Sequence, residues 1–191
     1  MKAIVIALIF VFACVGSSWA QMAPSPSTPA AAPAAAAPVK DPVTAALKML
    51  LPTRQKNVLA AIDAMPADKF SYKPTPDQMT FGHLVVHIIE SNNGLCAKAA
   101  DVPAPKAEEV KDTDSKDKLA VAAKASFDFC TDAIGKMSDA KLGDSIELFG
   151  KQFPRAMAAL GVASSLADHY GAAAMYLRLN NILPPSAQPK K

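Results

Sequence analysis

The segment TFGHLVVHIIESNNGLCAKAA, residues 80–100, decides the fold of this chain. Its apolar residues recur three and four positions apart, a spacing that places side chains on one face of a helix. They are Phe81, Leu84, Val85, Ile88 and Leu95. We expect a helix from Thr80 to about Ala100, because Pro103 and Pro105 interrupt the pattern that follows. The segment therefore predicts an amphipathic helix with one side in a core.

The segment before it has the same periodicity, between residues 41 and 65. Asp41 followed by Pro42 is typical of a helix start, with Asp41 as the capping residue and Pro42 at the first helical position. Pro52 lies inside the pattern. It must kink or split the helix, because proline lacks an N–H and clashes with the preceding turn.

Two further helical patterns follow. The first runs from about Asp114 to Met137, and the second takes Pro154 in its first turn and continues to Asn180. Beyond residue 41 the sequence has no strand-like alternation of useful length. Four amphipathic helices with connections of roughly ten to fifteen residues predict an all-α four-helix bundle over residues 41–187.

Residues 1–20 have the features of a secretory signal peptide. Lys2 precedes an apolar run that ends in small residues, so cleavage is expected after Ala20. The run is shorter than the roughly 20 apolar residues that span a membrane. Lipidation at Cys14 is an alternative, which the bulky Phe12 disfavours.

Residues 21–40 are rich in proline and alanine and carry no charge until Lys40, which predicts a linker between the signal peptide and the bundle. The folded domain is therefore expected to be exported, either periplasmic or secreted. The net charge is +3, and the lysines after residue 100 alternate with acids. This pattern predicts a solvated surface with no nucleic-acid partner. We expect no membrane span, because no other segment is apolar over the length that a span needs.

Cys96 and Cys130 are the cysteines that remain after cleavage of the signal peptide. Both fall on apolar helix positions, and disulfides persist outside the cytoplasm. We expect a disulfide between neighbouring helices. The alternative is a pair of buried free thiols.

The chain has three histidines, His83, His87 and His169. His83 and His87 are four residues apart and share a helical face, with His87 next to the core stripe and expected to point inward. His169 lies among small residues of the last helix, which predicts a close helix approach or a cavity. Glu90 could add a carboxylate, and the candidate pocket residues are Ser165, Tyr176 and Glu90. The simpler interpretation is that these histidines are hydrogen-bonded structural residues.

The order and spacing of four motifs resemble the DinB/YfiT-like superfamily over residues 41–187. The motifs are Met65-Pro66 with the Asp68–Thr75 stretch, Thr80–His87, His169–Asn180, and Pro184-Pro185-Ser186. The resemblance implies a four-helix bundle with a three-histidine site for a divalent metal ion, either zinc or nickel. Some relatives are thiol-dependent S-transferases or isomerases, and a homodimer is the reasonable expectation from the family.

Carried over by position, the resemblance assigns metal ligands to His87 and His169. The middle ligand of the family falls on Ser165, a poor ligand for zinc or nickel, so His83 becomes the substitute third ligand. One hypothesis is then an exported metal-binding protein with hydrolase or thiol-transferase-like activity on an unknown small molecule. The alternative is a non-catalytic protein of the cell envelope that has lost the complete site.

Overall fold

The computed structural model describes residues 37–106 and 109–189. The signal peptide expected at residues 1–20, and the linker expected at 21–40 except for its last four residues, lie outside these ranges. The chain divides into two units, Met1–Ala37 and Pro38–Lys191, and the second unit contains every helix and strand discussed below.

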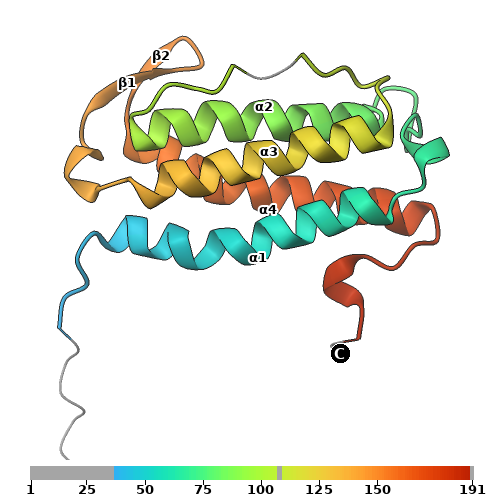
Figure 1. The fold of residues 1–191 in the computed structure, drawn as a ribbon, viewed down its shortest axis with the longest axis horizontal. Coiled ribbons are helices and arrows are strands. Elements are labelled where there is room, and N and C mark those ends of the chain that lie inside the picture. Colours follow the sequence, from blue (N-terminus) through green and yellow to red (C-terminus); the bar gives the residue numbers. More distant parts are fainter. Residues whose placement is uncertain (1–36, 107–108, 190–191) are drawn as a thin grey trace, which may run out of the picture. The chain divides into compact units, whose positions relative to one another are not determined.

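Four helices form the second unit: α1 (Pro42–Ala64), α2 (Phe81–Ala100), α3 (Lys116–Gly135) and α4 (Ala156–Leu179). α2 packs on α3 and α4, and α1 packs on the same two helices (Figure 1). The all-α four-helix bundle predicted from the sequence is confirmed. Within the described ranges, none of these helices is both long and apolar enough to cross a bilayer.

In Figure 1, α1 and α4 run from left to right and α2 and α3 run from right to left, so α2 and α3 are parallel to each other. Parallel neighbours need a long connection, and the crossover at residues 101–115 runs back along α2 to supply it. The crossover passes so close to the start of α2 that a Cβ atom at Gly82 would clash with the backbone oxygen of Asp112. Glycine at position 82 is therefore required for this path.

A β-hairpin between α3 and α4 was not predicted. Strands β1 (Ser145–Leu148) and β2 (Lys151–Pro154) pair antiparallel, and Ile146 and Leu148 are buried. The turn residues Phe149 and Gly150 have φ values of 52° and 73°, as a two-residue hairpin turn requires. Each strand has four residues, too few to give a clear alternation. Pro154 ends β2, so its assignment to the first turn of the last helix is wrong.

The start of α1 also differs from the prediction. Asp41 has a left-handed φ of 49° and does not cap the helix with its side chain. The carboxylate of Asp139 accepts hydrogen bonds from Val43 N at 2.8 Å, Thr44 N at 2.9 Å and Thr44 Oγ1 at 2.6 Å instead. Asp41 accepts from the backbone N–H of Asp139 in return, at 2.9 Å. α1 is continuous through Pro52, so that proline does not split it.

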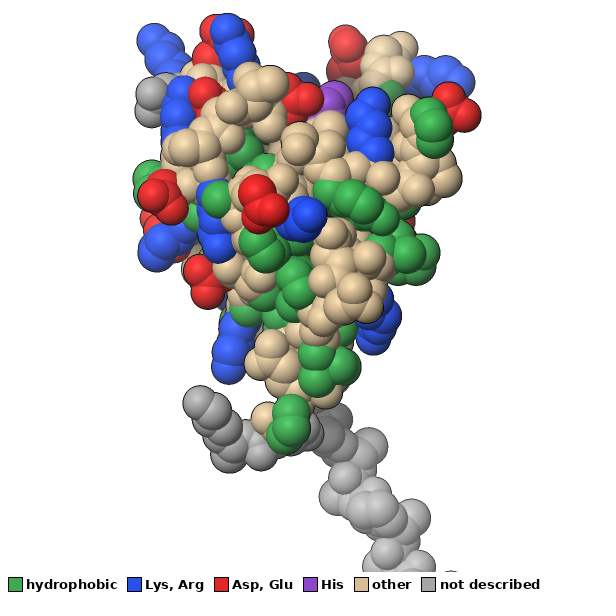
Figure 2. All heavy atoms as spheres, turned by 90° about the vertical axis from the view of Figure 1, so that its right-hand side faces the viewer, with side chains coloured by type: hydrophobic (Ala, Val, Ile, Leu, Met, Phe, Trp, Pro, Cys, Tyr) green, Lys and Arg blue, Asp and Glu red, His purple; other side chains and the backbone are tan. Residues whose placement is uncertain are grey.

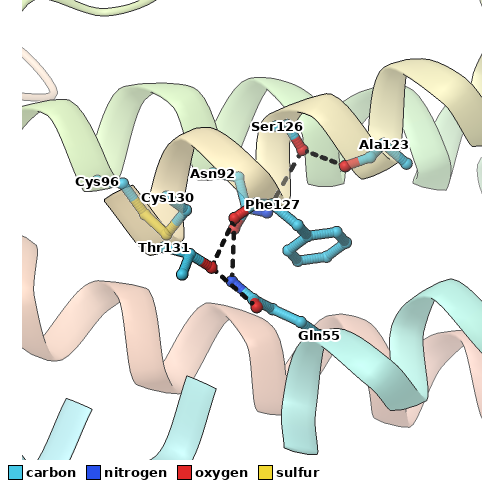
Figure 3. Close-up of a disulfide and its surroundings, with 8 residues drawn as sticks. All are labelled: Gln55, Asn92, Cys96, Ala123, Ser126, Phe127, Cys130 and Thr131. Atoms are coloured by element: carbon cyan, nitrogen blue, oxygen red, sulfur yellow. Dashed lines mark hydrogen bonds between the residues drawn. A yellow bond between two sulfur atoms is a disulfide. The ribbon is translucent and has the colours of Figure 1, made fainter. Parts of the chain in front are cut away.

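The core lies between the four helices, and a disulfide is part of it. Cys96 of α2 and Cys130 of α3 are bonded, both fully buried, with their Cα atoms 5.2 Å apart (Figure 3). The predicted disulfide is therefore present, and the alternative of free thiols is wrong for this structure. In the chain-entropy model, a cross-link over 34 residues stabilises the fold by about 3–4 kcal/mol.

Candidate functional site

The centre of the site is a pair of imidazoles from α2 and α4. The ring centroids of His87 and His169 are 4.9 Å apart, and the ring planes meet at 80°. His169 is half-buried, whereas His87 is exposed. The expectation that His87 points into the bundle is wrong, because its position on α2 lies at the edge of the buried face, where the groove to α4 opens.

Both histidines line a hollow of about 450 Å³. Its other walls come from α2, α4 and the loop that precedes α2, and they are Asp77, Gln78, Met79, Leu84, Asp168, Ala172 and Tyr176. The hydroxyl of Tyr176 donates a hydrogen bond to the carbonyl oxygen of Met79 at 2.6 Å. Tyr176 therefore holds the loop against α4 and lines the hollow, and its role as a pocket residue remains a prediction.

Ser165 lies one helical turn before His169, and its Oγ is 3.2 Å from His169 Nδ1. This hydrogen bond orients the imidazole and leaves Nε2 as its available nitrogen. On α2, Ser91 makes a longer contact of 3.5 Å between its Oγ and His87 Nε2. Each histidine of the pair thus has a serine hydroxyl beside it on its own helix.

The electrostatic environment favours neutral imidazole at His169. Burial lowers the pKa of His169 from its ordinary 6.5, and the neighbouring His87 lowers it further, while Asp168 opposes the change. Burial also raises the pKa of Tyr176, with Tyr72 adding to the effect. At neutral pH the site therefore combines a neutral imidazole with a protonated phenol.

His83 is not brought to the pair. Its side chain is exposed, and its Nδ1 lies 3.8 Å from a carboxylate oxygen of Asp112 on the crossover. Although His83 is one turn before His87, it projects toward the crossover and does not line the hollow. Its predicted use as a substitute third ligand therefore has no support in the geometry.

Glu90 lines a neighbouring hollow of about 470 Å³ that shares His87 with the first. The exposed Phe149 at the hairpin turn forms part of its wall. Glu90 does not line the hollow that contains His169.

A divalent cation fits the donors at the histidine pair only in part. Imidazoles bind zinc and nickel well, and a spacing of 4.9 Å between ring centroids is compatible with two ligands of one ion. Ser165 offers only a hydroxyl, which is already hydrogen-bonded to His169. Across residues 37–106 and 109–189, no three His, Cys, Asp or Glu side chains lie close enough to hold a metal ion together. The residues fit a two-histidine site with open positions and do not fit the three-histidine site that the resemblance implies.

Sequence reasoning did not identify the loop wall at Asp77–Met79 or Asp168 at the rim of the hollow. The hydrogen bond from Tyr176 to Met79 joins residues 97 positions apart, and periodicity carries no information about such contacts. The turn-rich composition just before Thr80 was the available signal, since loops that precede a helix commonly carry binding residues.

The end of the bundle where α2 begins and α4 ends carries charges of both signs. On the face shown in Figure 2, basic and acidic side chains are interspersed around a central apolar region. The absence of a nucleic-acid partner remains a prediction.

Comparisons with known proteins identify the family. Residues 50–173 match the model of the DinB superfamily, a range that includes all three histidines. The fold is similar to that of a DinB-like protein from Bacillus subtilis, with a TM-score of 0.60 and 19% identity over 76% of this chain and 99% of that one. A DinB-like protein from Bacillus cereus gives a TM-score of 0.56 and 18% identity over 69% and 89%. No curated protein matches the sequence. This chain belongs to the DinB superfamily.

Proposed function

We propose that this chain is an exported DinB-superfamily protein that binds a small molecule in the histidine hollow, together with a weakly held divalent cation. The observation that carries the proposal is the pairing of His87 and His169 from two different helices, with ring centroids 4.9 Å apart at one hollow of about 450 Å³. A cation bound there would supply Lewis-acid activation of a water or thiol, the chemistry of a hydrolase or thiol transferase.

The surrounding residues would prepare the pair for this role. The lowered pKa of His169 keeps its ring neutral, so the nitrogen lone pair is free at neutral pH. Ser165 orients the ring through Nδ1. Asp168 adds a carboxylate at the rim, which attracts a cation, and Tyr176 holds the loop wall in place. The two histidines are the groups that would hold the ion.

Two features support the proposal of export. Residues 1–20 have the pattern of a cleavable signal peptide. The Cys96–Cys130 disulfide belongs to the kind of bond that forms and persists in oxidising compartments.

Titration calorimetry with zinc and with nickel tests the cation site, on protein purified without a polyhistidine tag. We expect one ion per chain with an affinity in the micromolar range, because only two protein ligands contribute. His87→Ala and His169→Ala are each expected to weaken binding at least about tenfold, as loss of one good ligand should cost more than about 1.4 kcal/mol. His83→Ala is the matched control, since His83 lies outside the hollow. Wild-type protein that binds no ion, or equal losses in all three variants, would contradict the proposal.

A non-catalytic binding protein of the cell envelope is the second candidate. The observation that favours it is the hydroxyl of Ser165, which occupies the position of the middle family ligand and is committed to His169. In that case a small molecule would bind in the hollow equally well in excess chelator. Under the first proposal, chelator would weaken the binding.

A further inference from the structure

The outward side of α4 is mainly apolar. Its exposed residues are Met157, Leu160, Ser164, Ala167, Asp168, Gly171, Met175, Arg178 and Leu179. They recur three and four positions apart, so they form one stripe along the helix, which we call the α4 stripe. Asp168 and Arg178 are the only charged side chains in it. The exposed side of α3, by contrast, carries Lys124, Asp128 and Asp132 in close succession.

Large apolar side chains of the α4 stripe are in contact with solvent. The exposed fractions are 46% for Met157, 61% for Leu160, 61% for Met175 and 52% for Leu179. Single residues of this kind are ordinary on a surface, whereas a continuous row of them marks an interaction site. The other sides of α4 pack on α1 and α2, so no element in residues 37–106 and 109–189 covers the stripe.

The sizes of the side chains are symmetric about the middle of the stripe. Large apolar residues lie toward both ends, and the small residues Ser164, Ala167 and Gly171 lie between them. A second α4 can therefore lie antiparallel on the first, with a two-fold axis between positions 167 and 168. Leu160 then lies opposite Met175 of the second copy, and Ser164 lies opposite Gly171. Because Gly171 has open space where a Cβ atom would be, the two helices can approach closely at the centre.

We propose that this chain forms a dimer with a second copy through antiparallel contact of the two α4 stripes. Two-fold pairing needs a surface that is complementary to itself, and the symmetric stripe supplies one. Helix α4 has 24 residues and is therefore about 36 Å long. A strip of that length and about 10 Å wide covers about 360 Å² on each copy, roughly half of what a stable interface buries per partner. The dimer is therefore expected to be weak, with a Kd of about 10–100 µM.

Asp168 limits the strength of this pairing. In the antiparallel arrangement its carboxylate lies beside the two-fold axis, near the same group of the second copy, and like charges repel each other. Asp168→Asn is therefore expected to tighten the dimer about threefold. Leu160 and Met175 do not line the histidine hollow, so their contact is independent of the function proposed above.

Charge substitutions test the pairing, with the Kd of the full protein measured by sedimentation velocity over a range of concentrations. Leu160→Lys and Met175→Glu each place a charge in the apolar contact and are each expected to weaken the dimer at least about tenfold. The two substitutions together place opposite charges face to face, so the affinity should return to within about threefold of wild type. Val121→Lys makes the same kind of change at an exposed position of α3 and should leave the Kd unchanged.

The double variant decides the arrangement, because recovery requires that positions 160 and 175 meet across the dimer. Circular dichroism should be the same for all variants, since both positions are exposed in a single copy. The proposal is overturned if the protein stays monomeric, which would leave the stripe to another occupant. It is also overturned if the single variants associate as well as wild type, or if the double variant associates no better than the single ones.

Discussion

Helix α2 packs on two other helices, and these two interfaces differ in character. We call them the α3 seam and the α4 seam. Toward α4 it presents the exposed His87 to a half-buried histidine, at an open hollow with ionisable walls. Toward α3 it is covalently joined through the fully buried Cys96, beside apolar residues and one polar network. We expect a division of labour in which the α3 seam holds the helix in place and the α4 seam carries the chemistry of the proposed function. The predictions below test that division, apart from one that removes a contact outside both seams.

The largest effect is expected from removing the disulfide. Cys96→Ala combined with Cys130→Ala should lower the free energy of unfolding by about 3–4 kcal/mol, because the unfolded chain gains the entropy that the cross-link removed. Urea denaturation measures this loss. If the two seams are independent, zinc affinity of the folded variant stays within about twofold of wild type, given that distant sites are usually additive. Affinity that falls in step with stability would show that the α3 seam also shapes the histidine site.

Completing the ligand set should give the next largest effect. Ser165→His places a third imidazole one turn before His169, at the position where the family resemblance implies a middle ligand. We expect zinc affinity to rise about 10–100-fold, or about 1.4–2.8 kcal/mol, as a third protein ligand is typical of stable zinc sites. Ser164→His makes the same change at the neighbouring exposed position and should leave the affinity near wild type. Calorimetry distinguishes these outcomes, and a similar gain in both variants would contradict the assigned geometry.

Removal of a helix cap tests stability outside both seams. Asp139→Ala should cost about 1–2 kcal/mol, because Val43 N, Thr44 N and the Thr44 hydroxyl all lose their acceptor. Asp132→Ala, at an exposed position of α3, is the control and should change stability by less than about 0.5 kcal/mol. The thermal midpoint of each variant measures the difference. An equal effect in both would mean that the carboxylate does not cap α1.

The smallest effect expected is on the pH dependence of stability. The folded state lowers the pKa of His169 below 6.5, so the unfolded chain binds more protons between the two values. Stability is therefore highest above the unfolded pKa, and it falls as the pH drops from that value through the lower folded pKa. His169→Gln should therefore give a shallower loss of stability between about pH 7 and pH 5 than wild type. Urea midpoints measured across that range check it, and parallel curves would contradict it.

The sequence allowed the helical framework to be predicted because its signals are local. The apolar spacing of residues 80–100 acts within a few positions. The helix start expected at Thr80 is local too, since Thr80 Oγ1 accepts a hydrogen bond from His83 N at 3.0 Å. Both cysteines fell on apolar positions of neighbouring helices, which was enough to anticipate their bond. The hairpin was missed because two strands of four residues carry too little pattern.

What could not be predicted depends on contacts between distant residues. Asp139 caps a helix that begins about 95 positions earlier, and nothing near Pro42 reveals it. The pairing of His87 with His169 came from the family resemblance alone, since helical spacing joined His87 to His83 instead. His83 and His87 have different surroundings. His83 lies beside Asp112 of the crossover, whereas His87 lines the hollow with His169.

The reciprocal contact between Asp41 and Asp139 has a mechanical consequence. Everything before Pro38 is attached through the start of α1, so a pulling force on that segment first loads the Asp139 carboxylate. The disulfide crosses only α2 and α3, and it offers α1 no covalent protection. Under tension, α1 should therefore separate from the bundle while α2 and α3 remain joined by the disulfide. Single-molecule extension should record an early unfolding step, and Asp139→Ala should lower the force at which it occurs. A later step should give a shorter extension, because the disulfide keeps the residues between Cys96 and Cys130 from extending.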